Sequence, residues 1–277
     1  MYNQDFVVYQ NNQRYIEILE EILSNEKTEI EEYPWKNESV YLITGGGGGI
    51  GRIIALEIAK RTKNSVIIIA GRSQENSSIK EFLSTLKQLG TEAIYRSVDV
   101  TNLSQVERLV KDIVKKYHVI SGVIHMAGVI HDQFIIRKSI EEFLEVLRVK
   151  VMGAVNLDLA TRDIKMDFMI YFSSITGELG NLGQADYAAA NRFMDNYSYY
   201  RNGRVSKHEC YGRTISINWP FWKEGKMQII PENVKQMNKE TGFLPLPYEE
   251  GIKVMGKSWM EKLDEIICIY GEAERIN

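Results

Sequence analysis

The stretch Val40-Tyr41-Leu42-Ile43-Thr44-Gly45-Gly46-Gly47-Gly48-Gly49-Ile50-Gly51 determines the fold more than any other part of the sequence. Its apolar start predicts a buried strand, and the glycines predict a tight turn that opens a helix. Such a turn lets the backbone approach a pyrophosphate, whose charge then lies among the unpaired N–H groups of the helix N-terminus. The stretch therefore predicts a dinucleotide site, with a merely flexible turn as the alternative.

Beyond that stretch, short apolar runs alternate with longer amphipathic ones. The runs predict strands, several of them covered on both faces, and the longer stretches predict connecting helices with right-handed crossovers. This alternation predicts an α/β fold, a doubly wound Rossmann-type parallel sheet of about seven strands with helices on both faces. The predicted strands are Val40–Ile43, Val66–Ala70, Ala93–Val98, Val119–Ile124, Phe168–Phe172, Thr214–Asn218 and Ile266–Tyr270, and the predicted helices lie near 50–62, 77–89, 103–117, 139–161 and 184–202.

The composition narrows the classes of function. With 277 residues and 44% hydrophobic content, the chain can bury the core of one main domain. A net charge of -3 gives no case for nucleic acid or a membrane surface as a partner. No apolar run reaches the roughly 20 residues of a membrane span, and no signal sequence follows Met1. Cys210 and Cys268 lack metal-ligand spacing, which predicts reduced thiols in a soluble, cytoplasmic protein.

Two segments depart from the strand and helix rhythm. In residues 1–37, Phe6–Tyr9 and Arg14–Ile18 flank a polar turn, which predicts a hairpin or a strand, turn and helix start, followed by an acidic linker from Glu26 to Trp35. Residues 220–247 are punctuated by proline and contain Met227 and Met237. A long insertion after a strand predicts a lid over a pocket, and a helical pair capping the sheet is the alternative.

Ser174 and Tyr187 are the candidate catalytic pair. Ser174 ends the apolar run Met169–Phe172 with Ser173 between, and Tyr187 lies thirteen residues later on the next predicted helix. This spacing allows a strand to end, a small-residue loop to cross and a helix to return the phenol beside the hydroxyl. Two aligned donors beside one carbonyl oxygen are what hydride reduction of a ketone needs. Ser173 competes for the serine role, but its side chain is expected on the opposite face of the strand.

The ends of the other strands carry candidate cofactor contacts. Arg72, with Ser73, follows the second predicted strand where an NAD-preferring site usually has an acid, and arginine there suits the 2′-phosphate of NADP. Asp99 and Val100 could border the adenine, and the alternative role of Asp99 is a helix N-cap. Ala127 and Gly128 would lie beside the nicotinamide ribose. The four histidines are scattered, so His125 is expected to be structural and no metal site is predicted.

The glycine pattern with Ser174 and Tyr187 resembles the short-chain dehydrogenase/reductase superfamily over about residues 38–277. Members normally carry Tyr-x-x-x-Lys, whereas the fourth residue after Tyr187 is Asn191. Lys150 occupies the position where the superfamily has an asparagine. This exchange, with Phe172-Ser173-Ser174, the run Gly180–Asn191 and Ile217–Pro220, resembles the ketoreductase domains of modular polyketide synthases, including the trans-acyltransferase type. Phe6–Leu19 resembles the end of the structural subdomain that precedes the catalytic one, so residues 1–37 are expected to be its remnant and a linker, and 38–277 the catalytic domain.

The resemblance implies a role for each matching residue. Tyr187 would protonate the ketone oxygen while NADPH supplies the hydride, Ser174 would hold that oxygen, Lys150 would tune Tyr187, and Asn191 would order the lysine or a relay water. As alternatives, the tyrosine could be a core residue, the lysine a solvated charge and the asparagine a cap. The cofactor contacts implied are Thr44, Gly45, Gly46, Gly47, Gly49, Ile50, Gly51, Arg72, Ser73, Asp99, Val100, Ala127, Gly128, Pro220 and Phe221.

Product stereochemistry is predicted from three motif positions. Members that form D-configured β-hydroxyl products share a Leu-Asp-Asp motif, here Ile130-His131-Asp132, and only the last aspartate is kept. The tryptophan that marks the opposite class would fall at Leu179. The prediction is a D-hydroxy product, with Asp132, Leu179, Gln184 and Trp222 as the substrate and stereocontrol residues.

The sequence thus predicts NADPH-dependent reduction of a β-ketoacyl thioester on an acyl carrier protein, beside neighbouring synthase domains. Reduction of an α-ketoacyl group on a hybrid peptide synthetase needs the same donors and stays open. A non-catalytic Rossmann scaffold is the alternative from another class, and the intact tetrad argues against it. A free-standing reductase of fatty acid synthesis is disfavoured by Asn191 and by the N-terminal segment.

Overall fold

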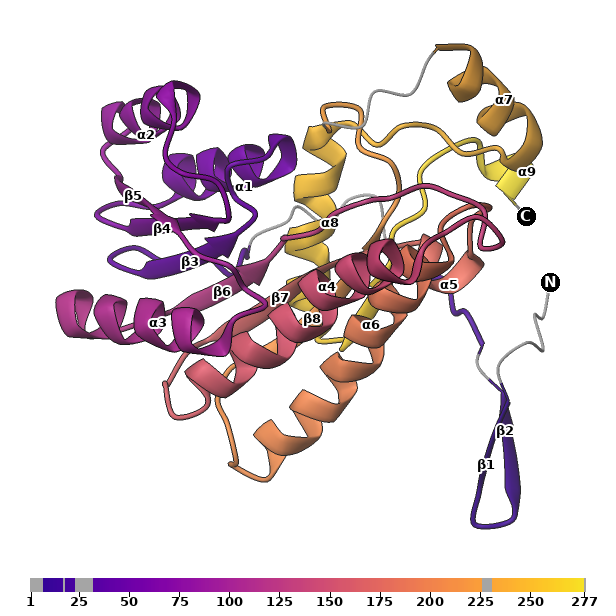
Figure 1. Cartoon of the computed structure of the whole chain (residues 1–277), viewed down its shortest axis with the longest axis horizontal. Coiled ribbons are helices and arrows are strands. Elements are labelled where there is room, and N and C mark those ends of the chain that lie inside the picture. Colours follow the sequence, from indigo (N-terminus) through magenta and orange to yellow (C-terminus); the bar gives the residue numbers. More distant parts are fainter. Residues whose placement is uncertain (1–6, 17, 23–31, 226–230, 277) are drawn as a thin grey trace.

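A seven-stranded sheet forms the centre of the computed structural model, which describes residues 7–16, 18–22, 32–225 and 231–276 (Figure 1). The strand order is β5-β4-β3-β6-β7-β8-β9, and every neighbouring pair is parallel. This order confirms the predicted doubly wound sheet. The strands are β3 (Val40–Thr44), β4 (Val66–Gly71), β5 (Glu92–Ser97), β6 (Gly122–His125), β7 (Phe168–Ser174), β8 (Arg213–Trp219) and β9 (Glu265–Ile267).

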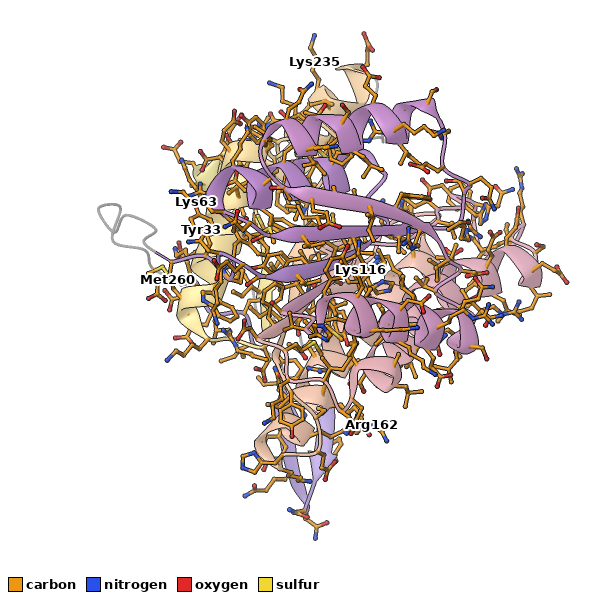
Figure 2. The ribbon with its side chains drawn as sticks, turned by 90° about the vertical axis from the view of Figure 1, so that its left-hand side faces the viewer. Tyr33, Lys63, Lys116, Arg162, Lys235 and Met260 are labelled. Atoms are coloured by element: carbon orange, nitrogen blue, oxygen red, sulfur yellow. The ribbon has the colours of Figure 1, made fainter. Side chains whose placement is uncertain are left out.

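Helices cover both faces of the sheet, as Figure 2 shows from the side, with Lys116 marking the end of α3. One apolar cluster joins α1, α2 and α8 to the strands, and a second joins α3, α4 and α6 to the other face. The five central strands, β4, β3, β6, β7 and β8, are buried almost throughout, whereas the edge strands β5 and β9 are only partly buried. This burial on both faces explains the continuous apolar runs of the central strands. The helices are α1 (Gly49–Arg61), α2 (Ser77–Gln88), α3 (Leu103–Tyr117), α4 (Ile140–Thr161), α5 (Thr176–Leu179), α6 (Ala185–Ser206), α7 (Pro231–Thr241), α8 (Tyr248–Glu261) and α9 (Ala273–Ile276).

The carboxyl ends of the central strands meet at one edge of the sheet. Thr44 at the end of β3 pairs in register with His125 at the end of β6, and Ser174 at the end of β7 pairs with Trp219 of β8. The chain crosses from one side of β3 to the other between β5 and β6, and crevices for ligands form at such switch points. The register therefore gathers the predicted site residues at this edge.

The N-terminal segment forms a separate antiparallel hairpin of β1 (Val7–Gln10) and β2 (Gln13–Ile16). Asn11 and Asn12 have φ values of 51° and 61°, as the two-residue turn of a tight hairpin requires. The hairpin form of the prediction is thus confirmed and the helix start is wrong. Figure 1 shows the hairpin projecting from the body of the molecule. Phe6 and most of the acidic linker lie outside the described residues.

The segment 220–247 is held at both ends by backbone contacts. Trp222 forms a β-bridge with Leu246, and Phe243 forms one with Gly271 near the C-terminus. Between them lies α7, which Figure 1 shows beside α9. Met227 lies outside the described residues, so the lid stays a prediction. Among the described helices, none combines the length and the apolar character that crossing a membrane would need.

Candidate active site

Ser174 and Tyr187 come together at the carboxyl edge of the sheet. Ser174 ends β7, and its Oγ accepts a hydrogen bond of 3.2 Å from the backbone N–H of Thr176, while Tyr187 lies in the first turn of α6. Burial raises the pKa of the Tyr187 hydroxyl, and hydrogen bonding with Asn191 and Ser174 acts in the opposite direction. The neighbouring Ser173 is buried on the other side of the strand, where its Oγ donates to the Asn191 carbonyl at 3.3 Å. The geometry therefore presents Ser174, not Ser173, to the tyrosine.

Lys150 supplies a cation to this pair from α4. Its side chain is buried, with only 3% of the residue exposed, so it is not the solvated charge of the alternative interpretation. The Nζ atom donates to the Phe172 carbonyl at 2.9 Å and lies 5.5 Å from the centroid of the Tyr187 ring. Burial lowers the pKa of Lys150 to about 8, against an opposing effect of Asp195. Because this pKa lies close to neutral pH, the protonation of Lys150 can change with the charge on a neighbouring phenol.

Asn191 is completely buried one turn after Tyr187. Its Nδ2 donates to the Tyr187 carbonyl at 2.7 Å, whereas its Oδ1 has no hydrogen-bond partner within the described part of the chain. The expected contact with Lys150 is not formed directly. A buried acceptor without a partner needs an explanation, and a relay water or a ligand hydroxyl would satisfy it.

Asp195, one further turn along α6, was not foreseen from the sequence. Its Oδ1 accepts from the Ser216 hydroxyl at 2.6 Å, and its Oδ2 lacks a partner among the described residues. Burial raises its pKa to about 7, and the nearby Glu265 carboxylate adds to this. The spacing of eight residues from Tyr187 places Asp195 on the same helix face, which is the signal that could have revealed it.

The glycine-rich turn forms a cradle into which a pyrophosphate fits. Gly45 has φ +72°, and a Cβ on it would lie 2.8 Å from the backbone nitrogen of Ala127. A Cβ on Gly51 would lie 2.5 Å from the Cα of Gly46, so this turn closes only with glycine. Gly48 caps α1 without a side-chain hydrogen bond, and the first turn of α1 has no acidic residue. The free N–H groups and the helix dipole are therefore available to an anion.

Arg72 and Ser73 border the cradle beyond β4. Both are exposed, as a site for a phosphate requires. Arg72 Nη1 lies 3.2 Å from Oε1 of Glu145, and the Ser73 hydroxyl lies 3.3 Å from the hydroxyl of Tyr95. An exposed ion pair of this kind is weak and can be exchanged for a phosphate.

Asp99 and Val100 follow β5. Asp99 Oδ1 accepts from the backbone and hydroxyl of Thr101, both at 2.9 Å. The N-cap of α3 is Asn102, so the capping role considered for Asp99 is wrong. Val100 is buried, and its carbonyl accepts from Asn156 Nδ2 at 2.8 Å.

The loop after β6, which is predicted to border the nicotinamide, has small residues beside the lysine. A Cβ on Gly128 would lie 3.3 Å from Lys150 Cε, and Ala127 is in contact range of Gly45. His125 is buried with its Nδ1 2.7 Å from the Thr44 hydroxyl, and burial lowers its pKa to about 3, so the ring is neutral.

The predicted substrate residues divide into two groups. Asp132 and Gln184 meet, because Gln184 Nε2 donates to Asp132 Oδ1 at 2.9 Å, and Leu179 is exposed at the end of α5. Trp222, by contrast, is 2% exposed and lies in the hydrophobic core, 4.9 Å from Trp219 between ring centroids. Its indole packs on Gly251, where even a Cβ would lie 2.2 Å away. The assignment of Trp222 to the substrate residues is therefore wrong.

The predicted cofactor residues Pro220 and Phe221 follow β8, where Pro220 is buried and Phe221 is half-buried.

The chain matches a known family over most of this region. The family model described as the KR domain covers residues 39–224, which is more than half of the sequence. The chain belongs to the KR domain family. This match confirms the resemblance that the exchanged lysine and asparagine indicated. Ketoreductase domains of this family are oxidoreductases that use a nicotinamide cofactor.

Similar proteins place this KR domain among polyketide synthases. Polyketide synthase PksN of Bacillus subtilis (strain 168) is 41% identical over 276 residues, which is 100% of this chain. PksL of the same organism is 44% identical over 245 residues, or 88% of the chain. The chain spans 5% of the length of each of these relatives. A crystal structure of a ketoreductase domain from the bacillaene assembly line has a TM-score of 0.89 at 38% identity, covering 98% of this chain and 64% of that one. An N-terminal ketoreductase from the macrolactin assembly line has a TM-score of 0.80 at 33% identity, covering 95% and 49%.

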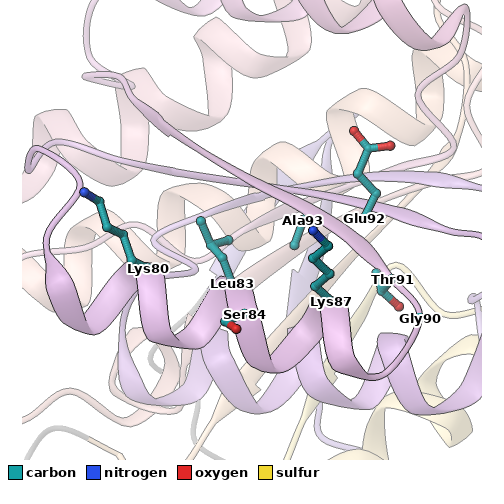
Figure 3. Close-up of a pocket in the computed structure, with 8 residues that line it drawn as sticks. All are labelled: Lys80, Leu83, Ser84, Lys87, Gly90, Thr91, Glu92 and Ala93. Carbon is teal, nitrogen blue, oxygen red and sulfur yellow. The ribbon is translucent and has the colours of Figure 1, made fainter.

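Asp195 also belongs to a cluster of carboxylates, and a second polar feature of the KR domain lies apart from the predicted site. The carboxylates of Glu178, Asp195 and Glu265 lie within 4.8 Å of one another, and Arg192 forms ion pairs with Glu178 and Glu265, so a guanidinium is the cation there. A hollow between α2 and β5 is lined by Lys80, Leu83, Lys87 and Glu92 among others (Figure 3). It lies at the edge strand and contains none of the predicted site residues.

Proposed function

We propose that this KR domain reduces a β-ketoacyl thioester, carried on an acyl carrier protein in the cytoplasm, to the D-configured β-hydroxyacyl thioester. NADPH is the reductant in this proposal. The observation that carries it is the buried Lys150, whose Nζ lies 5.5 Å from the Tyr187 ring beside the serine that ends β7. These are a proton donor, a cation that tunes it and a second donor for one carbonyl oxygen.

The residues at the carboxyl edge fit a dinucleotide. The cradle accepts the pyrophosphate because its glycines admit close approach and α1 begins without a side-chain cap. Arg72, with Ser73, would hold the 2′-phosphate that distinguishes NADPH from NADH, since a guanidinium binds phosphate with paired hydrogen bonds. Asp99 and Val100 would border the adenine, and Ala127, Gly128, Pro220 and Phe221 would border the nicotinamide half. When bound, the cofactor supplies a hydride to the carbonyl carbon.

The chain's own residues would manage the proton. Tyr187 would donate its hydroxyl proton to the carbonyl oxygen, which Ser174 holds by a hydrogen bond. The Lys150 ammonium, whose Nζ lies 5.5 Å from the Tyr187 ring, would favour the phenolate that remains, because a nearby opposite charge stabilises the charged form. The unpartnered Oδ1 of Asn191 would hold a water through which the proton is replaced. General acid assistance of this kind contributes about 10²–10⁴ in rate.

The substrate side of the proposal depends on the loop after β6. Asp132 and Gln184, joined at 2.9 Å, would guide the acyl chain, and the exposed Leu179 at the end of α5 would contact it. The hairpin of β1 and β2 exposes Tyr9, Tyr15 and Ile16. A two-stranded hairpin is marginal alone in water, which supports our proposal that it completes a structural subdomain of a larger synthase.

Reduction assays test this function. The native chain is mixed with NADPH and a β-ketoacyl N-acetylcysteamine thioester, and NADPH absorbance is followed; Tyr187→Phe is the matched variant that loses only the hydroxyl. Turnover by the native chain that is lost in the variant supports the proposal. An α-ketoacyl thioester as the better substrate would redirect it to α-keto reduction. Binding of NADPH without oxidation of it by either thioester, even on a carrier protein, would leave a non-catalytic scaffold.

A further inference from the structure

The loop 131–138, between β6 and α4, is attached to the N-terminus of α6 beside the catalytic tyrosine. The backbone N–H of Gln133 donates to the Gly183 carbonyl at 3.0 Å. Gln184 Nε2 donates to Asp132 Oδ1 at 2.9 Å. Two segments separated by some fifty residues in the sequence thus share a hydrogen-bonded seam.

Lys138 and Asp186 form the third and most buried contact of this seam. Lys138 Nζ lies 2.6 Å from Asp186 Oδ2, and each side chain is 1% exposed. The same Nζ also donates to the His131 carbonyl at the opposite end of the loop. The other carboxylate oxygen of Asp186 accepts from the backbone N–H of Tyr187 at 2.9 Å. One buried ion pair therefore connects both ends of the loop to the backbone of Tyr187.

Burial of this pair calls for a reason other than stability. Removing both charges from water is costly, and a well-packed apolar pair is often as stable or more stable. Separating a buried ion pair, however, leaves an uncompensated charge, whereas apolar side chains tolerate sliding. The contacts of Lys138 and Asp186 thus specify where the loop lies relative to Tyr187.

We propose that Lys138 and Asp186 are positioning residues that determine which face of the ketone receives the hydride. This inference rests on the proposed function. The bound cofactor would supply the hydride and Tyr187 the proton, each from a fixed position in the site. The product configuration therefore depends on the direction from which the acyl chain enters the active site. Asp132 and Gln184 line that entry, and the ion pair sets their distance from the tyrosine. A loop free to shift would admit the chain from both directions.

The test compares product configuration in three variants with the native chain. Lys138→Met removes the ammonium, and Asp186→Asn removes the charge but keeps an acceptor for the Tyr187 N–H. The double variant carries both changes, which avoids an unpaired buried charge. Each protein reduces a β-ketoacyl N-acetylcysteamine thioester with NADPH, and the two enantiomers are separated by chiral chromatography. We expect the ratio of minor to major enantiomer to rise at least tenfold in the double variant, with the Kd for NADPH within twofold of the native value.

The control is the exposed pair of Lys116, near the end of α3, and Glu92, at the start of the edge strand β5, which are joined at 2.9 Å. Its double variant, Lys116→Met with Glu92→Gln, should keep the native enantiomer ratio. An active double variant of Lys138 and Asp186 with the native ratio would overturn this inference and leave the proposed function standing. If that variant does not fold, the isosteric Asp186→Asn alone decides in the same way. A native chain that reduces neither the β-ketoacyl nor the α-ketoacyl thioester would overturn both proposals.

Discussion

The two ends of α6 both bury polar side chains, but they satisfy them differently. Near its C-terminal end, the fully buried Arg201 donates from Nε to Asp158 and from Nη1 and Nη2 to the carbonyls of Gly212 and Tyr211. Both oxygens of Asp158 are occupied, the second by Arg204 and Tyr197. In the N-terminal half of α6, Asn191 Oδ1 and Asp195 Oδ2 have no partner in the described chain, and the neighbouring Lys150 of α4 is buried with a lowered pKa.

This difference separates a structural cluster from a functional one. The charged atoms of Arg201 and Asp158 are all hydrogen-bonded, although the neighbouring Tyr171 hydroxyl has no partner within the described residues. Paired buried charges rigidify a fold, whereas unpaired polar atoms cost stability unless a ligand or water completes them. A protein retains such a cost where function requires it. We therefore propose that the C-terminal end of α6 is its anchor and that its N-terminal half belongs to the active site.

The largest expected effect is on catalysis at Tyr187. Tyr187→Phe should lower kcat by about 10²–10⁴, because the proton donor is lost while the ring remains. The same change at the other end, Tyr197→Phe, removes the hydroxyl that donates to Asp158 at 2.9 Å and should cost about 1–2 kcal/mol of stability with kcat unchanged. Turnover assays and thermal denaturation of both variants make the comparison. Equal kcat losses in the two variants would contradict it.

A second prediction concerns Arg72, whose ion pair is exposed, whereas that of Arg201 is fully buried. Arg72→Ala should raise KM for NADPH about 10- to 100-fold, the range expected for loss of a charged hydrogen bond, and leave KM for NADH unchanged. Its single ion pair is exposed, so the melting temperature should not move. Steady-state kinetics with both cofactors provide the measurement. A parallel loss with NADH would remove Arg72 from the 2′-phosphate site.

The site and the anchor could be predicted from the sequence to different extents. Continuous apolar runs such as Val66–Ala70 predict strands because both sheet faces are covered. Ser174 ends one of these strands, and the following helix α6 places Tyr187 beside it. Trp222 was misassigned because the glycine that receives its indole, Gly251, lies on a later helix. Lys138 and Asp186 were not foreseen because 48 residues separate them and only the folded loop makes them partners. Local patterns therefore specify elements, while long-range pairing of charges needs the structure.

A third prediction concerns the pH dependence of the rate. Lys150, with a pKa of about 8, loses its charge as pH rises through that value. The neutral amine no longer favours the Tyr187 phenolate, so kcat/KM for reduction should fall above about pH 8, by up to tenfold per pH unit. A profile from pH 6 to pH 10 checks this. Persistence of the same alkaline limb in Lys150→Met would assign it to another group.

The smallest expected effect is at Asp195, whose pKa is raised from 3.8 to about 7. The folded chain then binds more protons than the unfolded chain between these values, so this carboxyl stabilises the fold at low pH and its contribution is lost as pH rises to about 7. Asp195→Asn should flatten that slope, by at most ~1.4 kcal/mol per pH unit. Urea denaturation at pH 5 and pH 7.5 measures it. Asp195 also raises the pKa of Lys150, so the variant should shift the alkaline limb of the rate to lower pH.

The most direct test of this contrast replaces one buried cation in the active site, and in a second variant one buried cation in the anchor, by methionine. Lys150→Met and Arg201→Met are each assayed for NADPH turnover with the β-ketoacyl thioester and for the free energy of unfolding. Lys150→Met should lose turnover at least about 10²-fold without losing stability, because the lysine is strained by burial. Arg201→Met should lose about 3–5 kcal/mol of stability, because Asp158 loses its main partner, yet keep its kcat while folded. Loss of stability without loss of turnover in Lys150→Met would contradict the account.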